Sequence, residues 1–589
     1  MAFRLRLDLF TALVLSFSPV LWAENASKPT AEPTLDPATM HSLGLYWIVQ
    51  GDDNKNARID VEYRKVSVDK PAAWLKGPPL FRVEKGAHKN EKGKSALNVP
   101  PEAWLFAGSV LMLEPGTEYE LHLVLIDPDG GNVEKTLSAK TASEPAVPEK
   151  LTTFHIAPGE GGGTGSAQDP FKGLNAALGV AKPGTLFLVH TGTYPGTFEE
   201  NKSGEPGNPI IFRGAGDGEV ILDAKDKEGK NAERTVTATD IHDVWFENLS
   251  MRNGTYVIVL HRSQRIVIRR CHISGCDYGI MCSNNTKGNV AGFFIADNVI
   301  ESYKTWPKPD DDKDYTEGYG IKLTGTGHEV CYNRIRGFAD GMDTCPSEHC
   351  YAIDFHHNEI SEMQDDGCEM DGSERNTRCF MNRFTNVFQG ISVQPIFGGP
   401  VYIIRNVLYN VDHEPFKMHN SPSGALMLHN TVAKARFALC LWTGEKVRNC
   451  IYRNNLFLGT EADYMYENSA PMLDCDFDYD GFSMTKMRDC LKWNKVVYKT
   501  FEDLKANAPV EKHAVWLDGA NVFASGLKPP GDYTKQFDPA TIDLRLKEGC
   551  AAIDAGEPLP GINAGFAGKA PDLGAYEFGQ ELPHYGPRK

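Results

Sequence analysis

A short repeat with an asparagine in each copy constrains what this chain can fold into more than any other feature of its sequence. The asparagines precede or lie within short apolar runs, and the last five intervals between them are 24 or 25 residues long. Short β runs that recur at this interval are typical of the coils of a parallel β-helix, where side-chain amides stack inside a turn and satisfy its backbone groups. The leucine spacing of leucine-rich repeats is absent. The repeat asparagines are Asn248, Asn298, Asn333, Asn358, Asn382, Asn406, Asn430 and Asn455.

The composition agrees with a turn-rich β protein and excludes several classes of function. The 589 residues include 56 glycines and 36 prolines, which favour many turns over long helices. Hydrophobic residues make up 41% of the chain, which excludes a disordered protein. Acidic residues outnumber basic ones by 78 to 61, and the net charge of −17 argues against a nucleic-acid partner.

Residues 1–23 are typical of a signal peptide. Arg4 and Arg6 give a basic start, residues 9–22 are an apolar stretch, and Ala23 ends a plausible cleavage site. An uncleaved anchor is the alternative, but the stretch is short for a membrane span and carries no stop-transfer flank. No later segment reaches the roughly 18 uncharged apolar residues of a span. We therefore expect a periplasmic or secreted protein, monomeric and without a membrane span.

The chain before the repeats is predicted to hold a linker and a small β domain. Residues 24–40 are rich in Pro, Ala, Ser and Thr, which is typical of a linker. Over residues 41–146 apolar and polar side chains alternate, which favours an antiparallel β-sandwich. The segment from Leu113 to Leu121, with Tyr119 near its end, resembles the end of a fibronectin type III domain, where a tyrosine closes a corner. We therefore predict a fibronectin type III-like domain over 41–146.

Residues 150–580 resemble the right-handed β-helix proteins of the pectate-lyase-like superfamily. The resemblance rests on Gly-Gly-Thr-Gly, Pro183-Gly184 and Gly192-Thr193-Tyr194 near the start, and on Ala570 to Glu577 at the end. It implies an all-β protein in which a right-handed parallel β-helix follows the small β-sandwich. That superfamily contains lyases, hydrolases, epimerases and phage spikes, so the fold alone does not define the reaction.

Strand alternation predicts one polar face on the β-helix. In each coil a glycine or its equivalent starts a strand, and every second residue after it points outward. The residues two positions on are Lys322, Asp343, Glu369, Ser392 and Lys417, and those four positions on are Thr324, Cys345, Asp371, Gln394 and His419. Just before the glycines lie Asp340, Asp365, Asp366, Gln389, His413 and Glu414. Like charges on strands about 4.8 Å apart repel, so this face needs a cation, a shared proton or interleaved basic side chains.

The first chemistry that fits is Ca²⁺-assisted β-elimination in a uronate-containing polysaccharide. Ca²⁺ prefers six to eight oxygen ligands, and a lysine beside it can act as the base. Asp340-Gly341, Asp365-Asp366-Gly367-Cys368-Glu369 and Phe416-Lys417 are similar to motifs of family 9 polysaccharide lyases. This resemblance implies Ca²⁺ ligands at Asp340, Asp365, Asp366 and Glu369, and a base at Lys417, with Lys322 as a second candidate. Glu369 stands where that family has Asp, and a whole coil separates it from Lys417.

The second chemistry is hydrolysis by two carboxylates, one acting as the acid and one activating water. Asp340 to Asp343, Asp365-Asp366 and Gln389-Gly390 resemble the order of motifs in family 28 glycoside hydrolases, the polygalacturonases, with Asp343 and Asp366 as the carboxylates. Phe338 and Gln389 replace an Asn and a His of that family, so elimination is the preferred hypothesis. A carbohydrate-binding surface protein without catalysis is the alternative of a different class.

Further side chains are predicted to contact an anionic polysaccharide. Gln394 and His419 lie on the predicted polar face, and Arg375 and Arg405 carry charges that suit carboxylates. The long insertion after Glu301 holds the aromatic residues Tyr303, Trp306, Tyr315 and Tyr319, of which Trp306 is a candidate to stack on a sugar ring.

Overall fold

The protein is described here from a computed structural model. It describes residues 25–67, 72–89, 95–225, 228–283, 289–309, 317–344 and 349–589. The predicted signal peptide, Tyr315 and Cys345 lie outside the described residues. Of the two α-helices in this part of the chain, α1 spans Leu174–Ala177 and α2 spans Phe501–Asn507. No described helix has the length and apolar character needed to cross a membrane.

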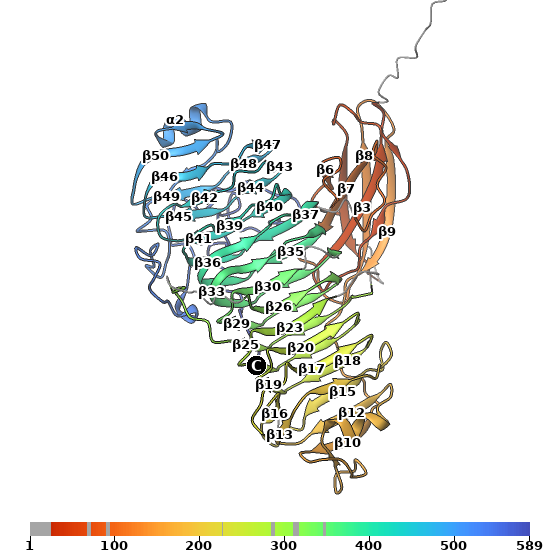
Figure 1. Ribbon diagram of the computed structural model, residues 1–589. Helices are drawn as coiled ribbons and strands as arrows, with labels where there is room; N and C mark the ends of the chain where they lie inside the picture. The colour runs from red at the N-terminus through yellow and green to blue at the C-terminus, as the bar shows by residue number, and fades with distance from the viewer. Residues whose placement is uncertain are drawn as a thin grey trace, which may run out of the picture.

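A right-handed parallel β-solenoid forms most of the molecule, as the repeat predicted (Figure 1). Its strands run from β10 (Thr152–Ala157) to β52 (Val515–Trp516) and pair in parallel from coil to coil, except that β51 (Val496–Tyr498) pairs antiparallel with β50 (Lys486–Trp493). The solenoid therefore ends earlier than the predicted boundary at 580. Residues after 516 form a largely strandless segment that packs on one side of the coils, with Leu544, Leu573 and Tyr576 in a shared apolar cluster.

The repeat asparagines form a buried ladder that fixes the spacing of the coils. Asn382 shows the pattern: its backbone N–H and its Nδ2 both donate to Asn406 Oδ1, at 3.0 and 3.1 Å, and Nδ2 also donates to Phe355 O at 2.9 Å. The ladder runs from Asn298 to Asn455 and ends at Asp480. Asn248 is the exception, because it is exposed with a φ of 53° and Leu249 takes the buried place beside it.

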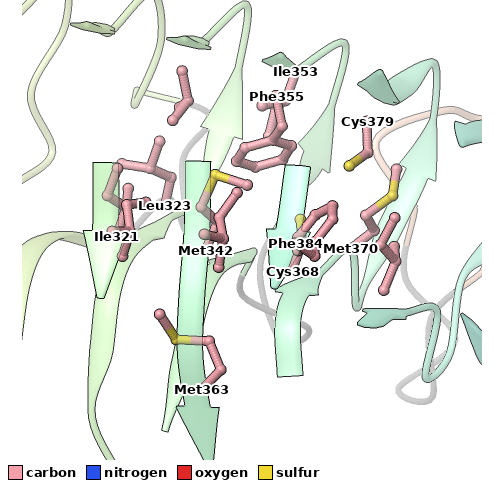
Figure 2. Close-up of a cluster of buried hydrophobic side chains, with 14 of the residues drawn as sticks. Ile321, Leu323, Met342, Ile353, Phe355, Met363, Cys368, Met370, Cys379 and Phe384 are labelled. Carbon is pink, nitrogen blue, oxygen red and sulfur yellow. The ribbon is translucent and has the colours of Figure 1, made fainter. Parts of the chain in front are cut away.

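The core lies inside the coils and backs the polar face. Ile321, Met342 and Cys368 pair in register on successive strands and are fully buried. Figure 2 shows these side chains packed with Phe355 and Phe384 from other strands of the coils. Each residue that follows them in the chain consequently points away from the core.

The N-terminal region is built from two small antiparallel sheets, an arrangement compatible with a β-sandwich. One sheet contains β1 (Lys28–Pro29), β2 (Thr34–Leu35), β3 (Leu43–Gln50), β6 (Phe81–Val83) and β7 (Trp104–Val110); the other contains β4 (Arg58–Lys65), β5 (Leu75–Lys76), β8 (Glu118–Ile126) and β9 (Val133–Lys140). Trp47, Phe106 and Leu123 share one core between them. The hydroxyl of Tyr119 accepts a hydrogen bond from the Glu114 N–H at 3.0 Å.

The linker predicted for residues 24–40 is wrong. β1 and β2 both pair with β3, and Trp47 Nε1 donates to Ala31 O at 2.7 Å, so this segment is part of the first sheet. Its Pro-rich composition reflects an edge position, where missing backbone donors cost little.

Buried polar contacts hold the N-terminal region against the solenoid. Asp36 accepts hydrogen bonds from Arg375 Nη2 at 2.7 Å and from Asn376 Nδ2 at 2.8 Å. Ser109 N–H donates to the hydroxyl of Tyr402 at 2.9 Å. The end of the chain joins the same assembly, because Arg588 bonds to Asp297 of the solenoid and to Glu144 of the connecting segment.

Candidate active site

The predicted row of polar side chains exists on five successive strands. The strands are β26 (Tyr319–Leu323), β30 (Asp340–Thr344), β33 (Glu359–Glu369), β36 (Arg383–Ser392) and β39 (Phe416–Lys417). Parallel register pairs Lys322 with Asp343, Asp343 with Glu369, Glu369 with Ser392, and Ser392 with Lys417. The row predicted from alternation is therefore confirmed in register.

Glycine occupies the position two residues before Lys322, Asp343, Glu369 and Ser392 of this row, and Pro415 occupies it before Lys417. A Cβ on Gly341 would lie 2.5 Å from Gly367 O and 2.9 Å from Ile360 Cγ2, and Gly367 and Gly390 are similarly confined. Close approach of the backbones at this point brings the residues just before the glycines, Asp340 and Asp366, onto the same side as the polar row. The Asp366 N–H donates to Asp340 Oδ1 at 2.9 Å.

Three of the four predicted metal ligands converge. One carboxylate oxygen from each of Asp340, Asp366 and Glu369 lies within 4.8 Å of the others. Asp366 Oδ1 is buried and has no hydrogen-bond partner in the described part of the chain, and neither has Oε1 of Gln389, its register neighbour. Hard oxygen donors with unsatisfied lone pairs fit Ca²⁺. The fourth predicted ligand, Asp365, is not part of this trio.

A lysine lies on each side of the carboxylates. Lys417 Nζ is 2.6 Å from Asp366 Oδ2, although one rung lies between those of Lys417 and Glu369. The intervening rung holds Ser392, whose short side chain leaves room for the lysine to reach across it. On the other side, Lys322 forms an ion pair with Asp343.

Burial and like charge shift the pKa values of the cluster. Burial raises the pKa of Asp343 to about 6 against the opposing effect of Lys322, and raises that of Asp366 to about 6 against Lys417. Burial, and then the neighbouring carboxylates, hold the pKa of Asp340 and of Glu369 well above the usual range. Burial alone would lower the pKa of Lys417, but Asp366 and Asp365 outweigh it and raise that pKa. The fold therefore concentrates more negative charge than its two lysines neutralise, and it favours a bound proton or cation.

The residues four positions after the glycines, among them Gln394 and His419, supply neutral and cationic groups to the polar face. His419 Nε2 is 3.0 Å from Glu414 Oε2, and this contact raises the pKa of His419. Glu414 is fully buried and also accepts a hydrogen bond from the Trp442 N–H at 2.6 Å. Gln394 lies in the same row, where its backbone N–H donates to Asp371 Oδ1 at 2.6 Å and its Oε1 has no partner among the described residues. His419 and Gln394 are thus placed on the predicted face.

Three predicted substrate contacts lie elsewhere. Arg375 is 3% exposed and is held by Asp36 at the interface with the N-terminal sheets. Arg405 donates to Ala575 O under the C-terminal segment. Trp306 is 4% exposed and donates to Tyr533 O of that segment. Each prediction was wrong because a distant part of the chain covers the side chain.

Two features of the site escaped the sequence interpretation. Glu414 was predicted only as one more surface carboxylate, and Gln389 only as a replacement for a histidine, yet the first holds His419 and the second places an unpaired oxygen beside Asp366. Their position directly before or near the repeat glycines was the available signal.

A second group with metal-ligand chemistry lies on another face of the solenoid. Glu329, Cys331 and His356 are buried, with possible ligand atoms within 4.8 Å of one another. Here the polar atoms already have partners, because Glu329 bonds to His356 and accepts from the Met40 N–H at 2.8 Å. This group belongs to the contact with the N-terminal region.

A family comparison agrees with the solenoid. Residues 229–394 match the family of right-handed β-helix regions. No curated protein matches the chain. Similar solved structures include pectate lyase Pel9A (17% identity, 73% of this chain and 97% of that one, TM-score 0.40) and XylC in complex with xylose (12%, 74% and 99%, 0.42). Another is the family 28 exopolygalacturonase of Yersinia enterocolitica (11%, 78% and 99%, 0.28). Values in this range leave the activity to be argued from the site.

Proposed function

We propose that this protein is an exported lyase that cleaves an anionic, uronate-containing polysaccharide by β-elimination. The observation that carries the proposal is the convergence of Asp340, Asp366 and Glu369 on one side of Lys417 Nζ. Such a site combines oxygen ligands for a divalent cation with a nitrogen that can take a proton. Periplasmic or secreted location follows from the predicted signal peptide and belongs to the same proposal.

The trio and the lysines have distinct roles in this mechanism. Asp340, Asp366 and Glu369 would hold Ca²⁺, which when bound neutralises a uronate carboxylate and acidifies the proton on the neighbouring carbon. Lys417 removes that proton, the bond to the leaving sugar oxygen breaks as a carbon–carbon double bond forms, and the leaving oxygen takes up a proton from water. Lys322, on the far side of Asp343, and His419 supply positive charge for substrate carboxylates. Asp366 raises the pKa of Lys417, so a free base at Lys417 would require that this carboxylate be engaged by a cation instead.

One experiment separates this proposal from its alternatives. The mature protein is incubated with polygalacturonate, alginate and other uronate polymers, in Ca²⁺ and in chelator, while ultraviolet absorbance and reducing ends are followed together. We expect Ca²⁺-dependent absorbance from an unsaturated uronyl end. Lys417→Ala should lower kcat/KM by about 10²- to 10⁴-fold, the usual contribution of a general base. Lys486→Ala is the control, because Lys486 is an exposed lysine on a later coil.

Other results would contradict the lyase proposal and favour one of its alternatives. Reducing ends without absorbance, in chelator as well as in Ca²⁺, would contradict elimination and favour hydrolysis by Asp343 and Asp366, whose pKa values near 6 suit an acid. In that case Asp366→Asn should be inactive. Retention of a polymer without any product would favour a binding protein.

A further inference from the structure

Three tyrosines continue the row of Asp340 and Asp366 toward the N-terminal end of the solenoid. Tyr256 pairs in register with Tyr278, and Tyr319 pairs with Asp340. Ile280 pairs with Ile321, which places Tyr278 beside Tyr319. Figure 1 shows their strands, β20 (Tyr256–His261), β23 (Tyr278–Ser283) and β26, as successive rungs leading to β30. Each tyrosine occupies the position that an aspartate occupies in the site.

The rings form an ordered stack that remains half-buried. The ring centroids of Tyr256 and Tyr278 are 4.4 Å apart with an angle of 11° between the planes, and those of Tyr278 and Tyr319 are 5.7 Å apart. The faces of Tyr256 and Tyr278 cover one another, whereas the planes of Tyr278 and Tyr319 are tilted by 33°, so this side of the solenoid offers ring edges and phenol hydroxyls. The hydroxyls of Tyr256 and Tyr278 have no hydrogen bond to any described residue that the structure records. The stack thus offers an apolar edge on each rung and hydroxyls without a partner among the described residues on Tyr256 and Tyr278, whereas the Tyr319 hydroxyl donates to Glu317 Oε2 at 3.4 Å.

The stack joins the candidate active site to a cavity. At one end, Lys322 Nζ lies 3.7 Å from the ring centroid of Tyr319 and also pairs with Asp343. At the other end, Arg234 pairs in register with Tyr256, and Thr197 Oγ1 donates to Arg234 O at 2.7 Å. Thr197 lines a cavity of about 660 Å³ together with Glu160, Lys172 and Asn175. The row of the tyrosines therefore runs from Arg234, which contacts a residue of this cavity, to the carboxylates.

The geometry points to a glycan-binding strip made by Tyr256, Tyr278 and Tyr319, which holds the sugar units of the substrate on the N-terminal side of the cleavage point. This inference rests on the proposed function for the class of ligand. A tyrosine provides an apolar body and a polar tip, which suits the C–H groups and hydroxyls of a sugar. Stacked rings are ordered before binding, so ligand binding costs little side-chain entropy. The one-per-rung repeat along the solenoid axis matches a polymer lying along that axis.

Binding without cleavage tests the strip. Affinity electrophoresis of the full chain in gels that contain polygalacturonate or alginate, with chelator present, measures retention independently of catalysis. We expect the double variant Tyr256→Ala, Tyr278→Ala to bind about tenfold more weakly than the wild type, a loss of about 1.4 kcal/mol in binding free energy. Tyr303→Ala is the matched control, because Tyr303 is 60% exposed and lies outside the row. With active protein, KM for the polymer should rise while the rate on the shortest cleaved oligosaccharide stays unchanged.

The experiments can contradict the glycan-binding strip and the proposed reaction independently of each other. Wild-type binding that depends on the tyrosines, without any product, supports the strip and contradicts the lyase. Cleavage with unchanged polymer affinity in the double variant overturns the strip alone, and so does a wild type that neither polymer retains. If the double alanine variant has a lower melting temperature than the wild type, the variant Tyr256→Phe, Tyr278→Phe is tested in its place. It keeps the stack and removes only the hydroxyls. A measurable loss of affinity then supports the inference, and an unchanged affinity overturns it.

Discussion

Asp340 is a buried carboxylate whose ionised form the fold supports poorly. It is 4% exposed, and the hydrogen bond from the Asp366 N–H is the one hydrogen bond recorded for its side chain in the described structure. Burial first, and then Asp366 and Asp365, raise its pKa well above the ordinary value of 3.8. The unfolded chain releases this proton near pH 3.8, whereas the folded chain keeps it to higher pH. The stability contributed by the bound proton is therefore lost as the pH rises through the folded pKa.

Asp340→Asn should distinguish the destabilising effect of the Asp340 charge from its role in binding Ca²⁺. The amide mimics the protonated acid, so in chelator the melting temperature of the variant should gain on that of the wild type between pH 5 and pH 8. Added Ca²⁺ should raise the melting temperature of the wild type at pH 8 and that of the variant much less, because one ligand is missing. Thermal unfolding at both pH values checks this, with the exposed Asp60→Asn as the control. Parallel pH curves and equal responses to Ca²⁺ would contradict the assignment of Asp340 as a ligand.

Single residues also show which features of the site could not be predicted from the sequence. Lys322, Asp343 and Lys417 were placed on one face by alternation, because the direction of a side chain in a strand is a local property. Which distant segment covers a side chain is not local. Arg375 is covered by Asp36 and Trp306 by Tyr533, each more than 200 residues away in the chain. Nothing in the immediate sequence of these two residues distinguishes them from exposed groove residues.

At the scale of the element, the asparagine ladder sets the rung spacing on which the site depends. Asn406 accepts two hydrogen bonds from Asn382, donates to Asn430 Oδ1 at 3.1 Å and donates to Cys379 O at 2.9 Å. The repeat made this element predictable, because a buried turn must satisfy its backbone groups in every coil. The reach of Lys417 across Ser392 was not predictable from the repeat, since it depends on the size of one side chain in the row.

Asn406→Ala should destabilise the solenoid strongly. It leaves the Asn382 N–H and Cys379 O, both buried, without their partners, and each unsatisfied group costs about 1–3 kcal/mol. We expect the free energy of unfolding to fall by roughly 3 kcal/mol or more, as measured by chemical denaturation. The control is Asn201→Ala, which removes an exposed amide outside the ladder and should change stability by less than about 0.5 kcal/mol. Equal effects of the two substitutions would show that the ladder does not stabilise the coils.

The whole molecule consists of the N-terminal sheets, the solenoid and the C-terminal segment, and polar contacts join these three parts. The N-terminal sheets contact the solenoid through Asp36 and Ser109, and the C-terminal segment returns to mid-solenoid, where Figure 1 places the end of the chain. Arg588 bonds there to Asp297 and Glu144, so it links the solenoid to the segment that connects it with the first sheets. This arrangement predicts that the parts unfold together.

Asp36→Ala tests that cooperativity. The substitution leaves the Arg375 guanidinium, 3% exposed, without its carboxylate, and removing one partner of a buried ion pair typically costs about 3–5 kcal/mol. Because the loss falls on the interface, we expect calorimetry to resolve two transitions in place of one, and proteases to cut between the sheets and the solenoid near residues 143–150. Asp60→Ala, in the same sheets but in an exposed pair with Arg58, should melt like the wild type. A single transition in the Asp36 variant, with no new cleavage, would mean that apolar packing between the parts is sufficient to keep them together.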